Sequence, residues 1–597
     1  MPPSFGAERA AVQEPLVRYA AEIGWAHLPP EEALTLRRGE GGTLLYPTLR
    51  ERLIALNPGV VAVDTVDGVV GRIEGVRTTI EGNAEVLAWL RGERSIHVER
   101  EKRQRNVTVI DFAHAAHNLF QVTDEWQYTN GQHTSRADVM FLVNGLPVAV
   151  VETKGARRRD AIDAGLAQIR RYHRETPELM TAPQVFDLTH LLDFYYGVTW
   201  SLDRKDLFNW KDEEPGSFER KVKRFFARER FLKLLGDWIV FFKRDDELRK
   251  IVLRQHQTRA VEKVVERAFD PEKRRGLVWH TQGAGKTFTM IVAAEQILAQ
   301  PAFEKPTVLM LVDRNELEGQ LFANLKAYGL PYEQATSKAR LRELLRADYR
   351  GLIVSMIHKF ERADASLCPR GNVFVFVDEA HRSTSGDLGN YLVGALPNAT
   401  LIGFTGTPID RIAYGRGTFK VFGGDDEKGY LDKYSIAESI ADGTTLPLHY
   451  TLAPNDIQVP REQLEREFLD LVEAEGVSDI EELNRILDRA VNLKAFLKAG
   501  DRVEQVAAFA ARHFRENVEP LGYKAFLVGV DREACALYKR ALDRHLPPEY
   551  SAVVYTSAHN DTELLAEYRL GEDDEKRVRK AFLRPGGLPK ILLVTEK

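Results

Sequence analysis

Short runs of strongly apolar residues, separated by longer stretches with helical spacing, recur through the middle of the chain. Those between residues 254 and 406 lie at 276–280, 307–312, 351–355, 373–377 and 400–404. Runs this short and apolar fit strands buried on both faces, and the stretches between them supply the helical crossovers that parallel strands need. The pattern predicts a parallel sheet wrapped by helices. A second pattern of this kind occurs at 525–530, 552–555 and 591–595.

The first of these strands leads into a glycine-bearing turn and then a helix, with the sequence LVWHTQGAGKT. Backbone N–H groups around Gly283 and Gly285, together with the helix N-terminus, can surround a polyphosphate. Lys286 would reach the β- and γ-phosphates, and Thr287 would hold magnesium. His280 stands where the usual pattern has its first glycine. The structural alternative is an ordinary glycine-rich turn.

A second motif argues against that alternative. The buried strand at 373–377 ends in Asp378 and Glu379, which would lie at the carboxyl edge of the sheet. Asp378 can complete the magnesium shell, and Glu379 can orient or deprotonate the attacking water. Thr405 and Thr407, in the sequence FTGTP, close another strand at the same edge. The ordered trio predicts an ATP site.

With these three motifs the chain resembles superfamily 2 helicases and translocases, whose two RecA-like domains close on ATP. The resemblance implies that Gln257 reads adenine and that His381 couples the ATP state to movement. It also implies that Asp313 and Arg314, in the sequence VDR, lie near bound nucleic acid. Gln257 could instead cap a surface helix.

A hairpin precedes the motor motifs. Asn144 and Gly145 separate two apolar runs, which is a strong hairpin signal. A two-residue loop would pair Asp138 with the residue before Glu152 and put the two acids on opposite faces. We therefore expect a three-residue loop or a bulge, which would bring both acids and Lys154 to one face.

Two carboxylates and an ammonium suit metal-assisted phosphodiester hydrolysis: Asp138 and Glu152 would hold magnesium while Lys154 steadies the attacking water or the developing charge. The structural alternative is an exposed strand end with assorted charges. Gln168 and Tyr172 follow, four apart on one helical face. They resemble the QxxxY element of RecB-like PD-(D/E)xK nucleases.

A nuclease-like domain followed by a motor resembles the R subunit of type I restriction enzymes, and the resemblance covers nearly the whole chain. It implies that Glu8 assists the nuclease metal, although a surface helix acid is the simpler interpretation. The arginines at 157–159 could anchor phosphate or lie in a solvated loop.

The predicted fold is α/β: a PD-(D/E)xK nuclease-like domain and two RecA-like parallel-sheet domains, the second incomplete. We expect the nuclease domain at 1–217, a basic and aromatic helical linker at 218–250, the ATP-binding domain at 251–445, and a partial second motor domain at 446–597. A charged, leucine-rich helical insertion is expected at about 461–499. Because the sequence ends before a later motor motif, we expect a truncated chain that binds ATP but hydrolyses it poorly.

The implied activity is ATP-dependent translocation and cleavage of unmethylated duplex DNA, with magnesium, in a complex with methyltransferase (M) and specificity (S) subunits. A different possibility is a repair or remodelling translocase whose nuclease-like domain only clamps DNA; a third is an assembly module without ATP hydrolysis. The net charge of −5 implies a local DNA-binding strip rather than a basic protein. Two distant cysteines and no apolar span predict a soluble protein of a reducing cytoplasm. The resemblance to type I restriction enzymes implies that this cytoplasm is prokaryotic.

Overall fold

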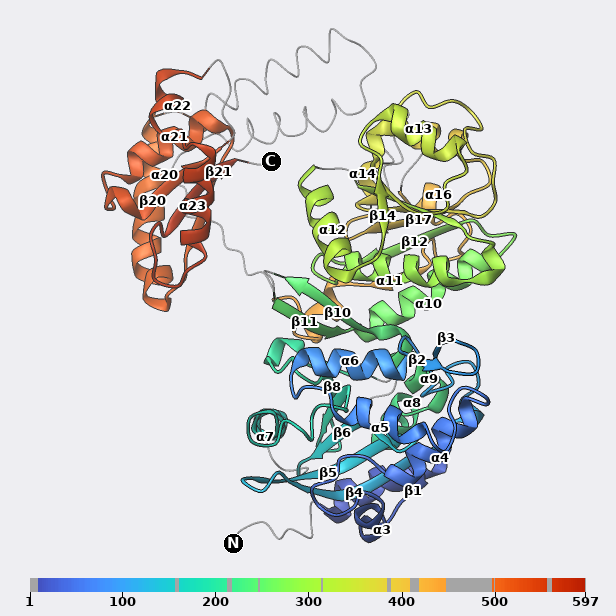
Figure 1. The fold of residues 1–597 in the computed structure, drawn as a ribbon. Coiled ribbons are helices and arrows are strands. Elements are labelled where there is room, and N and C mark those ends of the chain that lie inside the picture. Colours follow the sequence, from blue (N-terminus) through green and yellow to red (C-terminus); the bar gives the residue numbers. More distant parts are fainter. Residues whose placement is uncertain are drawn as a thin grey trace. The chain divides into compact units, whose positions relative to one another are not determined.

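The structure is a computed structural model in which the chain forms two compact units, 1–448 and 449–597 (Figure 1). It describes residues 9–155, 160–211, 217–244, 247–312, 315–383, 388–408, 418–446, 497–498, 500–555 and 561–595. Within these ranges no helix is both long and apolar enough to cross a membrane.

The first unit begins with a mixed seven-stranded sheet in the order β1-β4-β5-β6-β7-β8-β9. Its strands are β1 (Ala26–His27), β4 (Phe120–Thr129), β5 (Thr134–Val143), β6 (Leu146–Thr153), β7 (Val185–Thr189), β8 (Phe194–Val198) and β9 (Phe208–Asn209). Around them lie α2 (Glu14–Glu22), α3 (Pro30–Leu36), α4 (Tyr46–Leu56), α5 (Val66–Glu74), α6 (Ile80–Leu90) and α7 (Ala161–Glu175), with a small hairpin of β2 (Ser95–Val98) and β3 (Arg103–Asn106).

Helix α7 is the crossover between the parallel strands β6 and β7. Its apolar stripe, including Leu166 and Ile169, is buried in one core cluster with Met140 and Val150 of the sheet. Because Tyr172 lies on the same stripe and is fully buried, packing of α7 holds this side chain against the sheet.

The segment after the first sheet corrects one prediction. It begins as helix, in α8 (Phe218–Phe225) and α9 (Arg228–Lys233), and its aromatic residues are packed as expected: Phe226 stacks on Phe141 with ring centroids 3.8 Å apart. The expected helix to residue 250 is wrong, because β10 (Ile239–Arg244) and β11 (Glu247–Val252) form an antiparallel hairpin. The four residues at 239–242 are β-branched or aromatic, types that favour strand.

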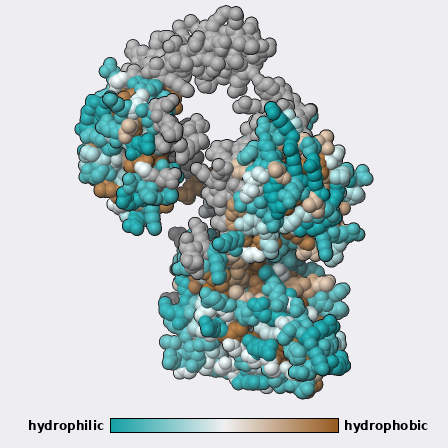
Figure 2. All heavy atoms as spheres, turned by 45° about the horizontal axis from the view of Figure 1, so that its top comes forward, coloured by the Kyte–Doolittle hydropathy of each residue, from teal (hydrophilic) through white to brown (hydrophobic). Residues whose placement is uncertain are grey.

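This hairpin joins the first sheet to the ATP-binding domain. Strand β10 contacts α12 (Asn315–Tyr328), and β11 contacts α6 and β8. Buried Val240 and Val252 belong to one apolar cluster that also includes Val261 of the next domain. Hydrophobic side chains are visible where the two domains of this unit meet (Figure 2).

The ATP-binding domain contains an all-parallel seven-stranded sheet in the order β14-β15-β13-β16-β17-β12-β18. Its strands are β12 (Arg275–His280), β13 (Thr307–Val312), β14 (Tyr332–Gln334), β15 (Gly351–Met356), β16 (Val373–Val377), β17 (Thr400–Thr405) and β18 (Asp432–Tyr434). The predicted strands are all present, and the short edge strands β14 and β18 are additional.

Helices cover both faces of this sheet, as predicted. The buried residues of α10 (Gln255–Phe269), α11 (Lys286–Ala299) and α12 (Asn315–Tyr328) belong to one apolar cluster, and those of α13 (Lys338–Arg346) and α15 (Leu388–Ala395) belong to the other. Short helices α14 (Ala380–Ser383), α16 (Thr418–Phe422) and α17 (Ile436–Ala441) follow strands at its carboxyl edge or join them.

The second unit has a three-stranded parallel sheet in the order β19-β21-β20. Its elements are β19 (Ala525–Gly529), β20 (Ser551–Val554) and β21 (Ile591–Thr595) with α20 (Gly500–His513), α21 (Arg532–Leu542), α22 (Glu563–Glu567) and α23 (Glu572–Phe582). The three predicted strands are present. Almost all of the predicted insertion at 461–499 lies outside the described residues.

Candidate nuclease and ATP sites

The turn of the β5–β6 hairpin combines a two-residue loop with a bulge. Asn144 and Gly145 both have positive φ, 53° and 84°, as a two-residue hairpin loop of this twist requires. Val143 pairs with Leu146 and Leu142 with Pro147, but the register shifts between Leu142 and Phe141, so that Val139 pairs with Val151. Continued by one residue, this register puts Asp138 opposite Glu152. The bulge is one of the two solutions that the sequence predicted.

Asp138, Glu152 and Lys154 lie together at the far end of this hairpin. Lys154 Nζ is 3.4 Å from Glu152 Oε2 and 3.7 Å from Asp138 Oδ2. The other partner of Asp138 is Thr153, whose backbone N and Oγ1 donate to Oδ2 at 2.8 and 3.1 Å. Glu152 is fully buried, whereas Asp138 and Lys154 keep a little exposure. The cluster is thus open to solvent on the side of Asp138 and Lys154.

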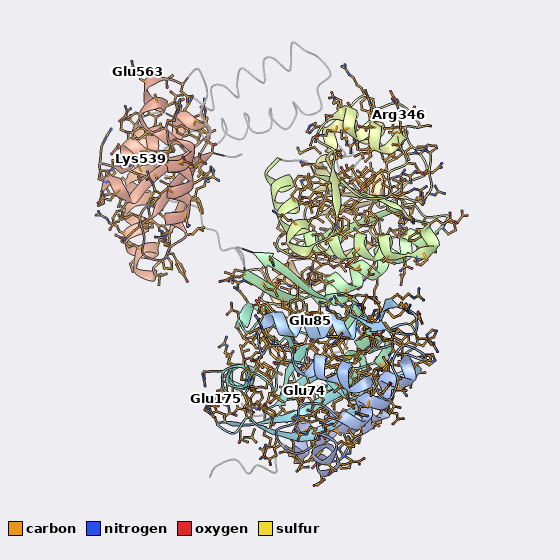
Figure 3. The ribbon with its side chains drawn as sticks, viewed as in Figure 1. Glu74, Glu85, Glu175, Arg346, Lys539 and Glu563 are labelled. Carbon is orange, nitrogen blue, oxygen red and sulfur yellow. The ribbon has the colours of Figure 1, made fainter. Side chains whose placement is uncertain are left out.

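Helix α7 closes the buried side of the cluster. The Tyr172 hydroxyl donates to Glu152 Oε1 at 2.8 Å, and it also contacts the Arg136 carbonyl oxygen. Gln168 Nε2 donates to the same hydroxyl at 2.7 Å. The two α7 side chains therefore act on the carboxylate in series: Gln168 orients Tyr172, and Tyr172 orients Glu152. Glu175 is the last residue of α7 (Figure 3).

Burial raises the pKa of Glu152 to about 8, with a further contribution from the charge of Asp138. Lys154 and the Tyr172 hydroxyl act in the opposite direction. Near neutral pH this carboxyl is largely protonated in the absence of a cation. A divalent cation between the two acids would favour the ionised form, since it supplies the positive charge that burial denies.

The donor set fits magnesium. Two carboxylates from neighbouring strands, one of them open to solvent, are the oxygen ligands with which Mg²⁺ binds while it keeps several waters. Lys154 lies within 4 Å of both acids and offsets part of their negative charge. Glu8 and the arginines at 157–159 lie outside the described residues.

Gln13 is a member of this site that the sequence did not reveal. Its Nε2 donates to the Asp138 backbone carbonyl at 2.8 Å and to Glu125 Oε1 at 3.1 Å. Glu125 has a φ of 52° in the middle of β4, a conformation that a non-glycine residue rarely adopts. Gln13 thus fixes the backbone of Asp138 from the first helical turn of the described chain. A lone glutamine more than a hundred residues away carries no sequence signal for this role.

The glycine-bearing turn lies between β12 and α11. Gly283 and Gly285 have φ values of 75° and 82°, and Gly285 is the N-cap of α11. The left-handed backbone conformation favours glycine at 285, where a Cβ would also come within 2.6 Å of Nε2 at the end of the Gln257 side chain. Lys286 begins the helix, and Thr287 follows in its first turn. The loop has the form of a phosphate-binding turn.

Lys286 and His280 are both buried beside this turn. Lys286 Nζ donates to the His280 carbonyl at 3.4 Å. The His280 ring points away into the sheet edge, where Nε2 is 2.8 Å from Asp432 Oδ2. Asp432 also binds Arg259 and Lys263 at 2.7 and 2.8 Å. His280 is therefore a structural link between β12 and β18, which explains why the position need not be glycine.

The two acids of the second motif follow β16 at the same edge. The backbone N of Asp378 donates to the Leu311 carbonyl at 2.9 Å. Burial and the neighbouring Glu379 raise the pKa of Asp378 to about 6, against the effect of Lys286. Glu379 has a φ of 45°, and its Oε2 is 3.5 Å from His381 Nδ1. Lys286 and Asp378 thus share one electrostatic environment, as an ATP site requires.

Two more predicted residues connect to this edge. His381 Nδ1 lies 2.8 Å from Thr405 Oγ1, which links the DEAH segment to the end of β17. Gln257 Nε2 donates to the Gly285 carbonyl at 3.0 Å, and its Oε1 accepts from Arg254 N at 2.9 Å. Gln257 thus both caps α10 and packs against the phosphate turn. Asp313 and Arg314 lie outside the described residues.

Comparisons with known proteins agree with this arrangement of two sites. Residues 7–201 match the family described as "Type I restriction enzyme R protein N terminus", and residues 256–481 match the family described as "SWI2/SNF2 ATPase". Each of the geometries described above lies within one matched segment, the β5–β6 hairpin in the first and the phosphate turn in the second.

Two curated relatives match almost the whole chain. A protein of Methanocaldococcus jannaschii, provisionally named the type I restriction enzyme MjaVIIIP endonuclease subunit, is 28% identical over 635 residues, covering 96% of this chain and 61% of that protein. The type I restriction enzyme HindI endonuclease subunit of Haemophilus influenzae is 26% identical over 639 residues, covering 96% and 58%. The chain spans about three fifths of the length of these relatives. The chain is therefore similar to the endonuclease subunits of type I restriction enzymes.

Proposed function

We propose that this chain is the nuclease and motor part of a type I restriction enzyme, which hydrolyses ATP to translocate duplex DNA and cuts it when it is unmethylated. Its partners would be the DNA and the M and S subunits, in the cytoplasm of a prokaryote. The observation that carries the proposal is the convergence of Asp138, Glu152 and Lys154, with distances of 3.4 and 3.7 Å from the ammonium to the two acids.

The residue roles belong to the same proposal. Asp138 and Glu152 hold Mg²⁺, which when bound polarises the scissile phosphate and activates water. Lys154 balances the negative charge that develops on the phosphate. Tyr172, itself held by Gln168, keeps Glu152 Oε1 in one orientation, and Gln13 fixes the backbone of Asp138.

For the motor we propose that the backbone of Gly283 and Gly285 surrounds the phosphates of ATP and that Lys286 binds the β- and γ-phosphates. Thr287 and Asp378 hold magnesium with the nucleotide, and Glu379 orients the attacking water. Gln257 reads the adenine, and His381, through its contact with Thr405, transmits the state of the nucleotide.

We also propose the domain boundaries 1–217, 218–250, 251–445 and 446–597. The match at 7–201 lies within the first, and the match at 256–481 supports where the third begins but extends beyond residue 445. Residues 218–250 then form a helical and hairpin linker whose β10–β11 hairpin contacts both neighbours.

The test is reconstitution. The chain is mixed with its cognate M and S subunits, unmethylated duplex DNA, Mg²⁺ and ATP, and DNA breaks are counted on a gel. The expected result is cleavage that needs all components. Methylated DNA is the matched control and should stay intact. DNA-stimulated ATP hydrolysis without any metal-dependent nicking would instead identify a translocase whose first domain only clamps DNA.

A further inference from the structure

A group of three potential metal ligands lies apart from both sites, in the segment before β4. Among the described residues, Asp111, His114 and His117 bring one ligand atom each to within 4.8 Å of one another. Asp111 Oδ2 is 3.3 Å from His114 Nδ1 and 2.8 Å from His117 Nδ1. Both histidines are exposed, so a cation can reach the group from solvent.

The backbone already holds these side chains in place. Asp111 Oδ1 accepts hydrogen bonds from the backbone N of Ala113 and of His114, each at 3.0 Å. This leaves Oδ2 as the oxygen that faces both imidazoles. His117 ends a 3-10 turn at Ala115–His117, and its carbonyl accepts from the Arg52 guanidinium. Hydrogen bonds of the chain itself thus hold Asp111 where its Oδ2 meets both imidazoles.

The distances fit a tetrahedral transition-metal ion. With bonds of about 2.0–2.1 Å, the ligand atoms of such a site are about 3.3 Å apart, and the two measured separations from Asp111 Oδ2 are 2.8 and 3.3 Å. Each Nδ1 now points at the carboxylate, where a cation would replace the two shared protons. The Nε2 atoms would then carry the imidazole hydrogens.

The ligand types select the class of cation. Imidazole nitrogen is a preferred ligand of zinc and its neighbours in the transition series, whereas magnesium takes oxygen ligands in octahedral geometry. Two imidazoles and one carboxylate therefore favour Zn²⁺ over Mg²⁺, the ion expected at Asp138 and Glu152. One or two coordination positions remain for water or for a donor from another molecule.

The cluster is connected by hydrogen bonds to the nuclease hairpin. Asn118 donates from Nδ2 to the Asp111 carbonyl at 2.7 Å and accepts at Oδ1 from Asp111 N at 2.9 Å. The same Oδ1 accepts from Nδ2 of Asn144 at 2.9 Å. Asn144 is fully buried and forms the turn between β5 and β6. A cation at the cluster would therefore stiffen the end of the hairpin opposite to Asp138 and Glu152.

We propose that Asp111, His114 and His117 form a binding site for a zinc-class divalent cation, distinct from the magnesium site, that braces the β5–β6 hairpin through Asn118 and Asn144. The site binds Zn²⁺, Co²⁺ or Ni²⁺ and does not need DNA, ATP or partner subunits. It stands whether or not the hairpin cleaves DNA.

The test is titration of the purified full chain with ZnCl₂ by calorimetry, in excess Mg²⁺ so that the carboxylate site is occupied. We expect about one tight zinc per chain, a rise in melting temperature on zinc addition, and a visible absorption band when Co²⁺ replaces zinc. His114→Ala and His117→Ala should each weaken zinc binding by at least about tenfold and remove the thermal shift.

Two controls separate this site from others. His133→Ala, an exposed histidine outside the cluster, and Glu152→Gln, at the hairpin acids, should both bind zinc like the unaltered chain. Asp111→Asn keeps an acceptor for the turn but removes the charge, and should weaken zinc binding even if a histidine variant proves unstable. Undiminished zinc binding by the His114→Ala/His117→Ala double variant, or the absence of tight zinc binding by the unaltered chain, would overturn the proposal.

Discussion

The Tyr172 hydroxyl lies 2.8 Å from Glu152 Oε1, so a helix stripe and a strand twenty residues earlier meet at one buried carboxyl. This contact is one of few polar interactions that Glu152 makes in an environment that raises its pKa to about 8. Burial therefore favours the neutral form of Glu152, whereas a bound metal would favour the ionised form. Several measurable properties depend on that balance.

Loss of the hairpin charges should abolish cleavage and leave nucleotide binding intact. Glu152→Gln removes a proposed metal ligand, and Lys154→Ala removes the ammonium that faces both acids. In the reconstituted complex each should reduce the rate of DNA breakage by at least about a hundredfold. Glu175→Gln, at the end of the same α7 (Figure 3), is the matched control and should cut normally. Cleavage that survived both hairpin substitutions would place the nuclease elsewhere.

Tyr172→Phe should move the pH profile of cleavage to higher pH. The hydroxyl lowers the pKa of Glu152, so its removal raises that pKa further and a smaller fraction of the acid is ionised at neutral pH. The rate near pH 7 should fall, and higher pH or more Mg²⁺ should recover most of it. Tyr195→Phe, on β8, should leave the profile unchanged. A uniform loss of rate at every pH would mean that the hydroxyl acts by packing alone.

The same pKa predicts how stability depends on pH without metal. Because the pKa of Glu152 in the folded chain, about 8, lies above its ordinary value of 4.5, the folded state binds the proton more tightly. Its contribution to stability is complete below about pH 4.5 and is lost as pH rises through 8. In EDTA, the melting temperature of the unaltered chain should therefore decline more steeply between pH 5 and pH 9 than that of Glu152→Gln. Parallel curves for the two proteins would contradict the assignment, and added Mg²⁺ should reduce the difference.

Lys286→Ala should have the complementary effect. The side chain is buried beside the phosphate turn, where its charge lowers the pKa of Asp378. Without it, ATP affinity measured with a fluorescent nucleotide should fall by at least about a hundredfold. The exposed Gln282→Ala in the same turn is the control. Persistent ATP-dependent cleavage by a complex that carries Lys286→Ala would contradict the proposed role of the motor.

Local patterns predicted much of this molecule. Apolar runs bounded by turns identified the long strands of both parallel sheets, and the Asn-Gly turn together with the need to face two acids the same way identified the bulge. These features depend on neighbours along the chain. The prediction of helix over the β10–β11 hairpin is wrong because its basic and aromatic residues fit the residue spacing of a helix as well as that of a strand. Only the packing of this segment between two domains decides in favour of strands.

Contacts between segments that are far apart in the chain could not be predicted from the sequence. The links from Gln13 to Asp138 and from His280 to Asp432 join residues more than a hundred positions apart. Strand β18, which carries Asp432, is only three residues long, and two of the three are polar. Neither its length nor its hydrophobic pattern therefore predicts a strand. The cluster at Asp111 could not be predicted from the sequence, because it depends on the turn geometry that brings both imidazoles to one carboxylate oxygen.

For the His280→Gly variant, the phosphate-loop sequence pattern and the structure predict opposite changes in ATP binding. The substitution restores the usual first glycine of the phosphate-binding pattern, and by pattern alone it should improve ATP binding. In the structure, His280 is fully buried, and its Nε2 is 2.8 Å from Asp432 Oδ2. Although burial raises the pKa of Asp432, hydrogen bonds from His280 and Arg259 hold it well below its usual range.

Glycine at this position would remove a partner of Asp432, leave a cavity beside Tyr434 and loosen the end of β12. We expect it to destabilise the chain by about 2–4 kcal/mol and to weaken ATP binding, because Lys286 Nζ rests on the carbonyl of residue 280. His358→Gly, at an exposed histidine of the same domain, should change ATP affinity little. Melting curves and nucleotide titrations of both variants test this role of His280. Tighter ATP binding by His280→Gly at an unchanged melting temperature would show that His280 is only a departure from the phosphate-loop pattern and does not link the two strands.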